Sequence, residues 1–462
     1  MKKVWMLLLM VLVCGGVALP ATAAEEDGNL TIPEVKKMIA EEAREQGIPP
    51  EILKAVAAVE NGYRQFEEDG SPVISPDGGI GVMQVTPENV DIPLDEDKLR
   101  TDIEYNIEIG AAVLNNKWEL SYLPDMNGGE REVLENWYFA VMAYNGLSAA
   151  NDPEINPGET YPEKVYERIE NFALIGLEGY FKFPEFAIRY EEGNEVMFFP
   201  EEAHYETETI TPSQQMYVTG DIVYTDERDG SLNMRDSSLG LVTDIWPYTP
   251  LTITGETLET DNPFNDYVYY KVEGVEVQGY VASAYLNQGT EDLIYEDPVD
   301  DQRAAALAFS SLHDYLQGYP DGRFGSHEQL TRHHAAVILD NILSLETPAD
   351  YEIQADDVTT GGIYYEQLRR TEYHGLLGGG GKLRPTENFT RSQMAQVMVE
   401  AFPEQYEEPV PHTFQDQEVI WNPEAVNTIY TNGITVADPF RPNQDITRSQ
   451  FAIFIYRTLV DM

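Results

Sequence analysis

The sequence has one cysteine and few basic residues, and both shortages limit what the protein can do. Its 462 residues include 29 lysines and arginines against 81 aspartates and glutamates, for a formal net charge of −52. With Cys14 alone, the chain has no disulfide framework and no cysteine metal site. Nucleic acids and anionic membranes are unsuitable partners, because both are bound through basic surfaces. Nothing in the sequence specifies a cofactor or a metal.

The first residues have the pattern of a secretory signal peptide. Lys2 and Lys3 precede an apolar run from Val4 to Cys14, and small residues follow up to Ala24. This run is too short to span a bilayer comfortably. We therefore expect residues 1–24 to be removed and the protein to be secreted to the cell wall or cell surface, with no membrane contact afterwards.

The remaining chain changes its pattern twice, which predicts a multi-domain α+β protein. Apolar residues recur at helical spacing in the first part, short alternating runs such as "LTITGETL" follow, and helices return in the last part. We expect a helical domain, a small β-barrel and a helical module made of an internal repeat. The predicted boundaries are 31–175 for the helical domain, 176–214 for a linker, 215–290 for the barrel, and about 300–345, 352–402 and 412–460 for three repeats.

The stretch "AVAAVENGYRQF" places a glutamate at the end of an apolar helical face. Leu53, Val56, Ala57 and Glu60 share the i, i+3, i+4, i+7 spacing of one face. A carboxyl group in this position is either solvated at the helix end or held at a cleft wall, where desolvation raises its pKa. The helix alone favours the solvated alternative, and the segments downstream favour the cleft.

Five segments share the order and content of a known catalytic domain. They are a helix ending in glutamate, a Gly-x-Met-Gln element, an Asn-Ile-x-x-Gly helix, an Ala-Tyr-Asn-Gly turn and a Tyr-x-x-Lys-Val element. They read "AVAAVENGY", "GIGVMQVTP", "NIEIGAAVL", "VMAYNG" and "YPEKVYERI". Together they resemble the soluble-lytic-transglycosylase family of lysozyme-like folds over about residues 36–170. The resemblance implies a helical domain that acts on peptidoglycan.

The resemblance also implies a mechanism and a set of site residues. Glu60 is the expected catalytic acid, since a carboxyl at an apolar cleft wall stays protonated near neutral pH. The implied reaction cleaves the MurNAc-GlcNAc β-1,4 bond and gives 1,6-anhydro-muropeptides. Asn61 stands where the family usually has serine, and Met83 and Gln84 are expected on the cleft floor. The expected substrate-binding residues are Asn61, Met83, Gln84, Tyr144, Asn145 and Tyr161.

Two other functions remain open at this point. A hydrolytic muramidase of the same fold would use water as the acceptor, activated by a second carboxylate. The acids near the site are Glu67, Glu68, Asp69 and Asp77, and none stands in a motif that commits it. Alternatively, the domain is a non-catalytic wall-binding or S-layer-associated protein that keeps a degenerate lysozyme fold, an alternative that Asn61 leaves open.

The alternating region resembles bacterial Src-homology-3-type domains of wall-associated proteins. "LNMRDSSLGLVTDI" is similar to their opening strand, and "YVYYKVEGVEVQGYVASAYL" to their closing strands. Its tyrosines, among them Tyr269, Tyr270 and Tyr285, either contact peptidoglycan or form the core of a spacer barrel. The sequence does not choose between these alternatives.

Three similar segments occur in the last part of the chain. "YPDGRFGSHEQLTRHHAAVIL", "GGGGKLRPTENFTRSQMAQVM" and "VADPFRPNQDITRSQFAIFI" each place a turn before a Thr-Arg pair that opens an amphipathic helix. They resemble S-layer homology repeats, which are arranged as a pseudo-threefold and dock proteins onto pyruvylated secondary cell-wall polymers. Asp357 and Asp416 match the aspartate that opens a repeat, whereas the first copy lacks a clear Phe-x-Asp.

The arginines of the Thr-Arg pairs are the expected polymer-binding residues. They are Arg332, Arg391 and Arg448. A guanidinium group can hold a carboxylate such as a pyruvyl ketal with two hydrogen bonds. The structural alternative is that threonine caps the helix and arginine binds a nearby carbonyl or aspartate. The expected partners of the whole chain are therefore peptidoglycan and a pyruvylated secondary cell-wall polymer.

Overall fold

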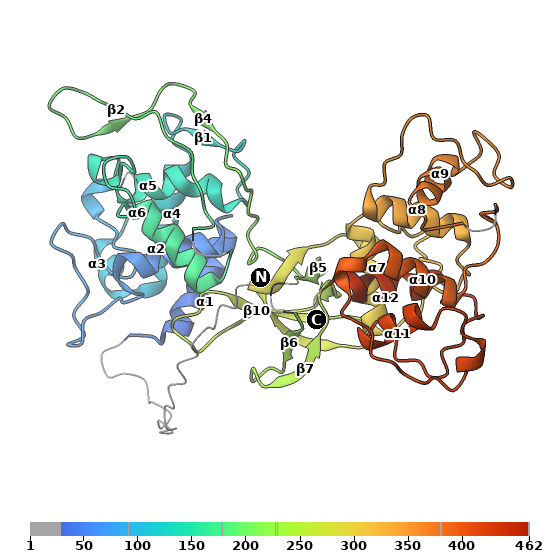
Figure 1. Cartoon of the computed structure of the whole chain (residues 1–462). Helices are drawn as coiled ribbons and strands as arrows, with labels where there is room; N and C mark the ends of the chain where they lie inside the picture. The colour runs from blue at the N-terminus through green and yellow to red at the C-terminus, as the bar shows by residue number, and fades with distance from the viewer. Residues whose placement is uncertain are drawn as a thin grey trace. The chain divides into compact units, whose positions relative to one another are not determined.

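The computed structural model of the chain describes residues 29–90, 92–176, 179–226, 228, 230–378 and 381–460. The predicted signal peptide lies outside these residues. The chain forms two compact units (Figure 1). The first comprises residues up to Ser213 together with Asp261–Asp266, and the second comprises Gln214–Thr260 and the chain from Tyr267 onward. The described part contains no helix that is long and apolar enough to cross a membrane.

Six α-helices among the described residues build the first unit, and local sequence explains their ends. Thr31 caps the first helix in a capping box with Glu34, and Pro50 lies in the first turn of the second. Gly62 ends the second helix with a left-handed φ of 69°. The helices are α1 (Ile32–Glu45), α2 (Pro50–Asn61), α3 (Glu96–Thr101), α4 (Ile103–Trp118), α5 (Tyr138–Asn145) and α6 (Tyr161–Arg168).

The helices of the first unit enclose one apolar core. Leu53, Val56 and Ala57, which were predicted to face protein, are fully buried in it. Helix α4 lies directly against the loop of the Gly-x-Met-Gln element. A Cβ atom on Gly110 would lie 2.4 Å from the Cβ of Met83, so only glycine allows this approach.

Residues 176–214 were expected to be a linker, but the described residues of this segment up to Ser213 are packed into a folded unit. They belong to the first unit, and Phe183, Phe186 and Tyr205 pack in or against its core. The ring of Phe186 lies 5.1 Å from that of Tyr138 and 4.9 Å from that of Phe139, between centroids. Short strands help to hold the segment: β2 (Arg189–Tyr190) pairs with β3 (Met197–Phe198), and β4 (His204–Tyr205) pairs with β1 (Asp125–Met126). Aromatic burial makes this segment part of the domain.

The predicted β region forms one antiparallel sheet in the second unit. Its order is β12-β5-β8-β10-β11-β6-β7, and β9 pairs with β10. Within the described residues this path is open between β12 and β7, so the closed barrel stays a prediction. The strands are β5 (Ile222–Thr225), β6 (Leu232–Arg235), β7 (Leu241–Ile245), β8 (Pro250–Ile253), β9 (Leu258–Glu259), β10 (Val268–Glu273), β11 (Gln278–Ala282) and β12 (Leu286–Gln288).

Two of the three tyrosines considered for peptidoglycan contact are core residues of the sheet. Tyr269 is 8% and Tyr270 1% exposed, and Tyr285 is half-buried. Tyr270 packs against Tyr217 with ring centroids 5.5 Å apart. Burial of these rings corresponds to the spacer alternative and removes Tyr269 and Tyr270 as exposed ligand contacts.

The three Thr-Arg pairs each open a helix, as predicted. Thr331, Thr390 and Thr447 are the N-cap residues of α8, α10 and α12. The residues just before these caps are joined in a ring by backbone hydrogen bonds. Leu330 N donates to Ile446 O (2.9 Å), Ile446 N to Phe389 O (2.9 Å), and Phe389 N to Leu330 O (2.7 Å). The helices here are α7 (Asp301–Leu312), α8 (Arg332–Leu343), α9 (Tyr365–Tyr373), α10 (Arg391–Ala401), α11 (Pro423–Thr431) and α12 (Arg448–Leu459).

The first repeat does contain an opening aspartate, which corrects the sequence analysis. Asp297, two residues after Tyr295, accepts hydrogen bonds from the backbone nitrogens of Phe324 (2.6 Å) and Ser326 (2.8 Å). Asp357 and Asp416 hold the matching turns of the other two repeats through backbone nitrogens in the same way. Tyr295 stands two residues before Asp297, where Ala355 precedes Asp357 and Phe414 precedes Asp416.

Candidate active site

The first unit contains a polar pocket of about 250 Å³ at the end of α2. Glu60, in the last turn of α2, lies in its wall. Side chains from α4 and α5 and from the loop after α2 complete the lining. The lining residues are Glu60, Ser75, Asp77, Gln84, Val85, Thr86, Asn89, Val90, Val113, Lys117, Tyr144 and Asn145.

Burial controls the protonation of Glu60. Desolvation raises the pKa of its carboxyl group from 4.5 to about 7; a hydrogen bond from Tyr161 opposes this rise, and the charge of Asp77 adds to it. The Tyr161 hydroxyl donates to Glu60 Oε1 at 2.6 Å. Tyr161 is itself buried and lies at the start of α6. At neutral pH this carboxyl group is therefore partly protonated and ready to donate a proton.

The loop that carries Gln84 is fixed by two buried amides. Asn106 of α4 accepts from Met83 N (2.9 Å) and donates to Ile80 O (2.9 Å). Gln65 accepts from Val82 N (3.1 Å). Gln84 adopts a positive φ of 47° and donates from Nε2 to Gly81 O at 2.8 Å. These bonds hold the loop against α4 and place Gln84 in the pocket wall.

Four of the predicted site residues meet at this pocket or at Glu60. Gln84, Tyr144 and Asn145 line the pocket, and Tyr161 contacts the carboxyl group of Glu60 directly. The Tyr144 hydroxyl donates to Met83 O at 2.7 Å, which ties α5 to the Gly-x-Met-Gln loop. Asn145 Oδ1 accepts from Asn151 Nδ2 at 2.9 Å. The Ala-Tyr-Asn-Gly turn is thus anchored on both sides of the pocket.

Asn61 and Met83 do not occupy the places expected of substrate-binding residues. Asn61 donates from Nδ2 to Gly81 O (2.7 Å) and Arg64 O (2.8 Å), so its amide joins the helix end to the loop. The side chain of Met83 is fully buried in the core and does not form the cleft floor. Both residues support the site through the backbone of the loop.

The pocket includes residues that the sequence motifs did not identify. Ser75, Asn89 and Lys117 lie outside the five segments and line the wall. Of the four acids considered as a second carboxylate, Asp77 lines the pocket, and the Ser75 hydroxyl donates to it at 2.5 Å. Asp77 follows a Ser-Pro turn, and only the folded loop reveals its proximity to Glu60.

The arginines of the three repeats are in surroundings that match the structural alternative. Each is at least nine-tenths buried, and each Nε donates to a backbone carbonyl. The bonds are Arg332 to Leu383 O (2.6 Å), Arg391 to Phe440 O (2.8 Å) and Arg448 to Phe324 O (3.0 Å). Each guanidinium also lies near the face of an aromatic ring. These bonds tie each arginine to the turn of another repeat.

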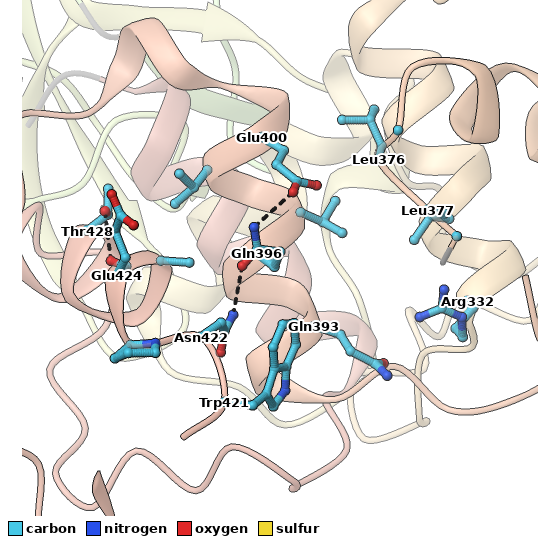
Figure 2. Close-up of a pocket in the computed structure, with 16 residues that line it drawn as sticks. Arg332, Leu376, Leu377, Gln393, Gln396, Glu400, Trp421, Asn422, Glu424 and Thr428 are labelled. Carbon is cyan, nitrogen blue, oxygen red and sulfur yellow. Dashed lines mark hydrogen bonds between the residues drawn. The ribbon is translucent and has the colours of Figure 1, made fainter. Parts of the chain in front are cut away.

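A second pocket, of about 680 Å³, lies among the repeats and includes Arg332 (Figure 2). Trp421, which is 59% exposed, stands at its wall beside Gln393. Other polar groups of the lining are linked to one another: Asn422 Nδ2 donates to Gln396 Oε1 (3.2 Å), and Gln396 Nε2 donates to Glu400 Oε1 (2.8 Å). An exposed indole beside amides and a carboxylate is a surface suited to a sugar ring.

Two segments of the chain match models of known protein families, one in each unit. Residues 37–161 match the family model described as the Transglycosylase SLT domain. Residues 413–452 match the S-layer homology domain.

Curated relatives match about a third of the chain. They include a surface-layer 125 kDa protein of Lysinibacillus sphaericus (29% identity over 34% of this chain and 14% of the relative) and an S-layer protein of Bacillus anthracis (29% over 31% and 17%). An uncharacterized cell wall amidase of Bacillus anthracis is 26% identical over 31% of this chain and 28% of the relative. The chain thus spans less than a third of the length of each.

The raised pKa of Glu60 predicts how stability changes with pH in the variant Glu60→Gln. Between pH 4.5 and about 7 the folded protein keeps a proton that unfolding releases, so raising the pH lowers the free energy of unfolding of the wild type. Glutamine carries no such penalty. We expect the stability of Glu60→Gln relative to wild type to rise over this range, by up to roughly 3 kcal/mol, and to level off above it. Urea denaturation at several pH values measures this difference, and a constant difference would contradict it.

Proposed function

We propose that the protein is an exported, wall-anchored lytic transglycosylase that cleaves the MurNAc-GlcNAc β-1,4 bond of peptidoglycan. The observation that carries this proposal is the carboxyl group of Glu60, with its pKa raised to about 7, in a polar pocket of the region that matches the transglycosylase domain. A proton donor of this kind is what departure of a sugar alcohol requires near neutral pH.

In the proposed reaction Glu60 acts twice. Its carboxyl group first donates a proton to the glycosidic oxygen as the bond from that oxygen to C1 of the muramic acid breaks. The N-acetyl group of the same sugar stabilises C1. The 6-hydroxyl oxygen then bonds to C1, and its proton passes to the Glu60 carboxylate, which restores the acid. The product is a 1,6-anhydro-muropeptide, and no water is consumed.

The other pocket residues have proposed roles that follow from their contacts. Tyr161 orients the Glu60 carboxyl through its 2.6 Å hydrogen bond. Gln84 and Asn145 offer amide groups that both donate and accept hydrogen bonds, which suits the acetamide and hydroxyl groups of the sugar. Tyr144 fixes the loop from the opposite side. In this proposal Asn61 and Met83 act as structural supports.

Asp77 favours a second candidate function, a hydrolytic muramidase. It lines the same pocket as Glu60 and is exposed, so it is a possible base for an attacking water. Hydrolysis would leave a reducing muramic acid. The products therefore distinguish the two reactions.

Anchoring to the wall is the proposed role of the second unit. The ring of backbone hydrogen bonds among the three Thr-Arg turns supports a pseudo-threefold of S-layer homology repeats. We propose that the pocket around Trp421 and Arg332 holds a saccharide of the secondary cell-wall polymer, with Arg391 and Arg448 bracing equivalent grooves. A pyruvylated sugar is the proposed ligand, and the sheet is proposed to be a Src-homology-3-type spacer.

Mass spectrometry of the soluble products released from purified peptidoglycan tests the catalytic proposal. The wild type is expected to release muropeptides lighter by one water than reducing ones, and Glu60→Gln is expected to release none. The control is Glu68→Gln, an exposed position outside the pocket that should leave release unchanged. Reducing muropeptides would establish the muramidase instead, and no release from a wall that the protein binds would leave a non-catalytic wall protein.

The anchoring proposal predicts that Trp421→Ala weakens wall binding. Loss of a stacking indole should raise the dissociation constant for isolated walls by about tenfold. The control is Val419→Ala, two residues earlier, which is similarly exposed but does not line the pocket. Cosedimentation with walls measures both. Equal binding by wild type and Trp421→Ala would contradict a ligand site at this pocket.

A further inference from the structure

A short segment from far along the chain completes the first unit. The chain leaves the sheet after β9 and returns to it at β10, and residues 261–266 between these strands belong to the first unit. The segment lies about a hundred residues beyond the part that matches the transglycosylase domain, which ends at residue 161. Phe264 packs against Phe172, with ring centroids 6.3 Å apart. The backbone nitrogen of Asp266 donates to Phe172 O at 2.6 Å.

Asp266 is the most deeply engaged residue of this segment. Its side chain is 3% exposed and accepts from three groups of the first unit. Lys36 Nζ lies 2.7 Å from Oδ1, the Tyr63 hydroxyl donates to Oδ1 at 2.9 Å, and Arg168 Nε donates to Oδ2 at 2.6 Å. These contacts overcome desolvation and lower the pKa of Asp266. A buried carboxylate with these partners is charged and firmly held.

Two of these partners lead to the Glu60–Tyr161 pair. Tyr63 follows the glycine that ends α2, and Glu60 lies in the last turn of that helix. Arg168 is the last residue of α6, and Tyr161, which donates to Glu60, is the first. The carboxylate of Asp266 therefore joins the end of the helix that carries the acid to the helix that carries its hydrogen-bond donor.

We propose that Asp266 is a positioning residue of this site. By holding Tyr63 and Arg168 together, it fixes α2 and α6 at the separation that lets Tyr161 donate to Glu60. This inference rests on the proposed glycan-cleaving function. The catalytic unit is then incomplete without a segment that lies between two strands of the sheet region, and a fragment limited to the matched domain would lack it.

The carboxyl groups of Glu60 and Asp266 have different charged and titratable neighbours. Tyr161, Tyr144 and Asp77 interact electrostatically with Glu60. Lys36, Tyr63 and Arg168 surround Asp266, and Lys54 Nζ also donates to its backbone oxygen at 3.3 Å. The two groups of partners are distinct, so Asp266 acts on Glu60 through the helices and not by direct contact.

A double-mutant cycle in the full-length chain tests this coupling. Asp266→Asn and Tyr161→Phe should each lower the kcat of muropeptide release by between about tenfold and a hundredfold, since both loosen the placement of the acid. If Asp266 acts through the Tyr161–Glu60 contact, Asp266→Asn should have little further effect in the Tyr161→Phe background. Multiplied effects would overturn the proposal.

Two more variants separate positioning from general stability. Tyr63→Phe removes one hydroxyl and keeps both ion pairs of Asp266, so this variant should fold even if Asp266→Asn does not. Its drop in kcat should be smaller than that of Asp266→Asn. In the Tyr161→Phe background, Tyr63→Phe should have little further effect. The control is Glu135→Gln, a buried carboxylate that accepts from Thr211 N at 2.9 Å and does not join α2 to α6. It should lower stability, and its effect on kcat should multiply with that of Tyr161→Phe.

The wild type in the same assay separates failure of the positioning role of Asp266 from failure of the proposed function. If the wild type releases product and the effects of Tyr63→Phe and Tyr161→Phe multiply, the positioning role of Asp266 is refuted and the proposed function is not. No product from the wild type would refute the proposed function, and the positioning role would fall with it.

Discussion

Burial of one carboxyl group at the end of α2 is the constraint on which the proposed chemistry depends. The chain has 81 aspartates and glutamates, and a carboxyl group in water has a pKa of about 4. Glu60 differs because its helix face is buried and its end forms a pocket wall. Desolvation and the hydrogen bond from Tyr161 act on its pKa in opposite directions, and desolvation dominates. The surrounding structure has to keep the carboxyl group of Glu60 buried and within hydrogen-bond distance of Tyr161.

Several parts of the chain supply that support. Asn106 and Gln65 fix the loop of Gln84 by hydrogen bonds to its backbone. The aromatic segment 176–213 covers the core beside α5 and α6. Asp266 joins the two helices that carry Glu60 and Tyr161. In the repeats, buried arginines donate to backbone carbonyls of the turns, and Asp297, Asp357 and Asp416 accept from backbone nitrogens of the turns.

Much of this could be predicted from sequence where the signal is local. Helical spacing located α2, the Thr-Arg pairs located the starts of three helices, and the ordered motifs placed Gln84, Tyr144, Asn145 and Tyr161 near Glu60. Features that depend on contacts between distant parts of the chain could not be predicted from sequence. The aromatic-rich segment before Ser213 has no helical or alternating period and resembled a linker. Asp266 contacts the helix of Glu60, through Lys54, only after the chain has passed through strands β5 to β9. Met83 matches its motif and Asn61 stands in place of the usual serine, and the side chain of Met83 packs against Gly110 while that of Asn61 bonds to Gly81 O.

The most direct test of the central claim is the titration of Glu60 itself. Carbon-13 NMR of protein labelled at its glutamate carboxyl carbons, with the Glu60 signal assigned from its absence in Glu60→Gln, reports protonation without requiring activity. The account predicts a midpoint at about pH 7. A midpoint near 4.5 would show a solvated carboxylate at the helix end. It would contradict the claim that burial keeps Glu60 protonated and able to act as the acid.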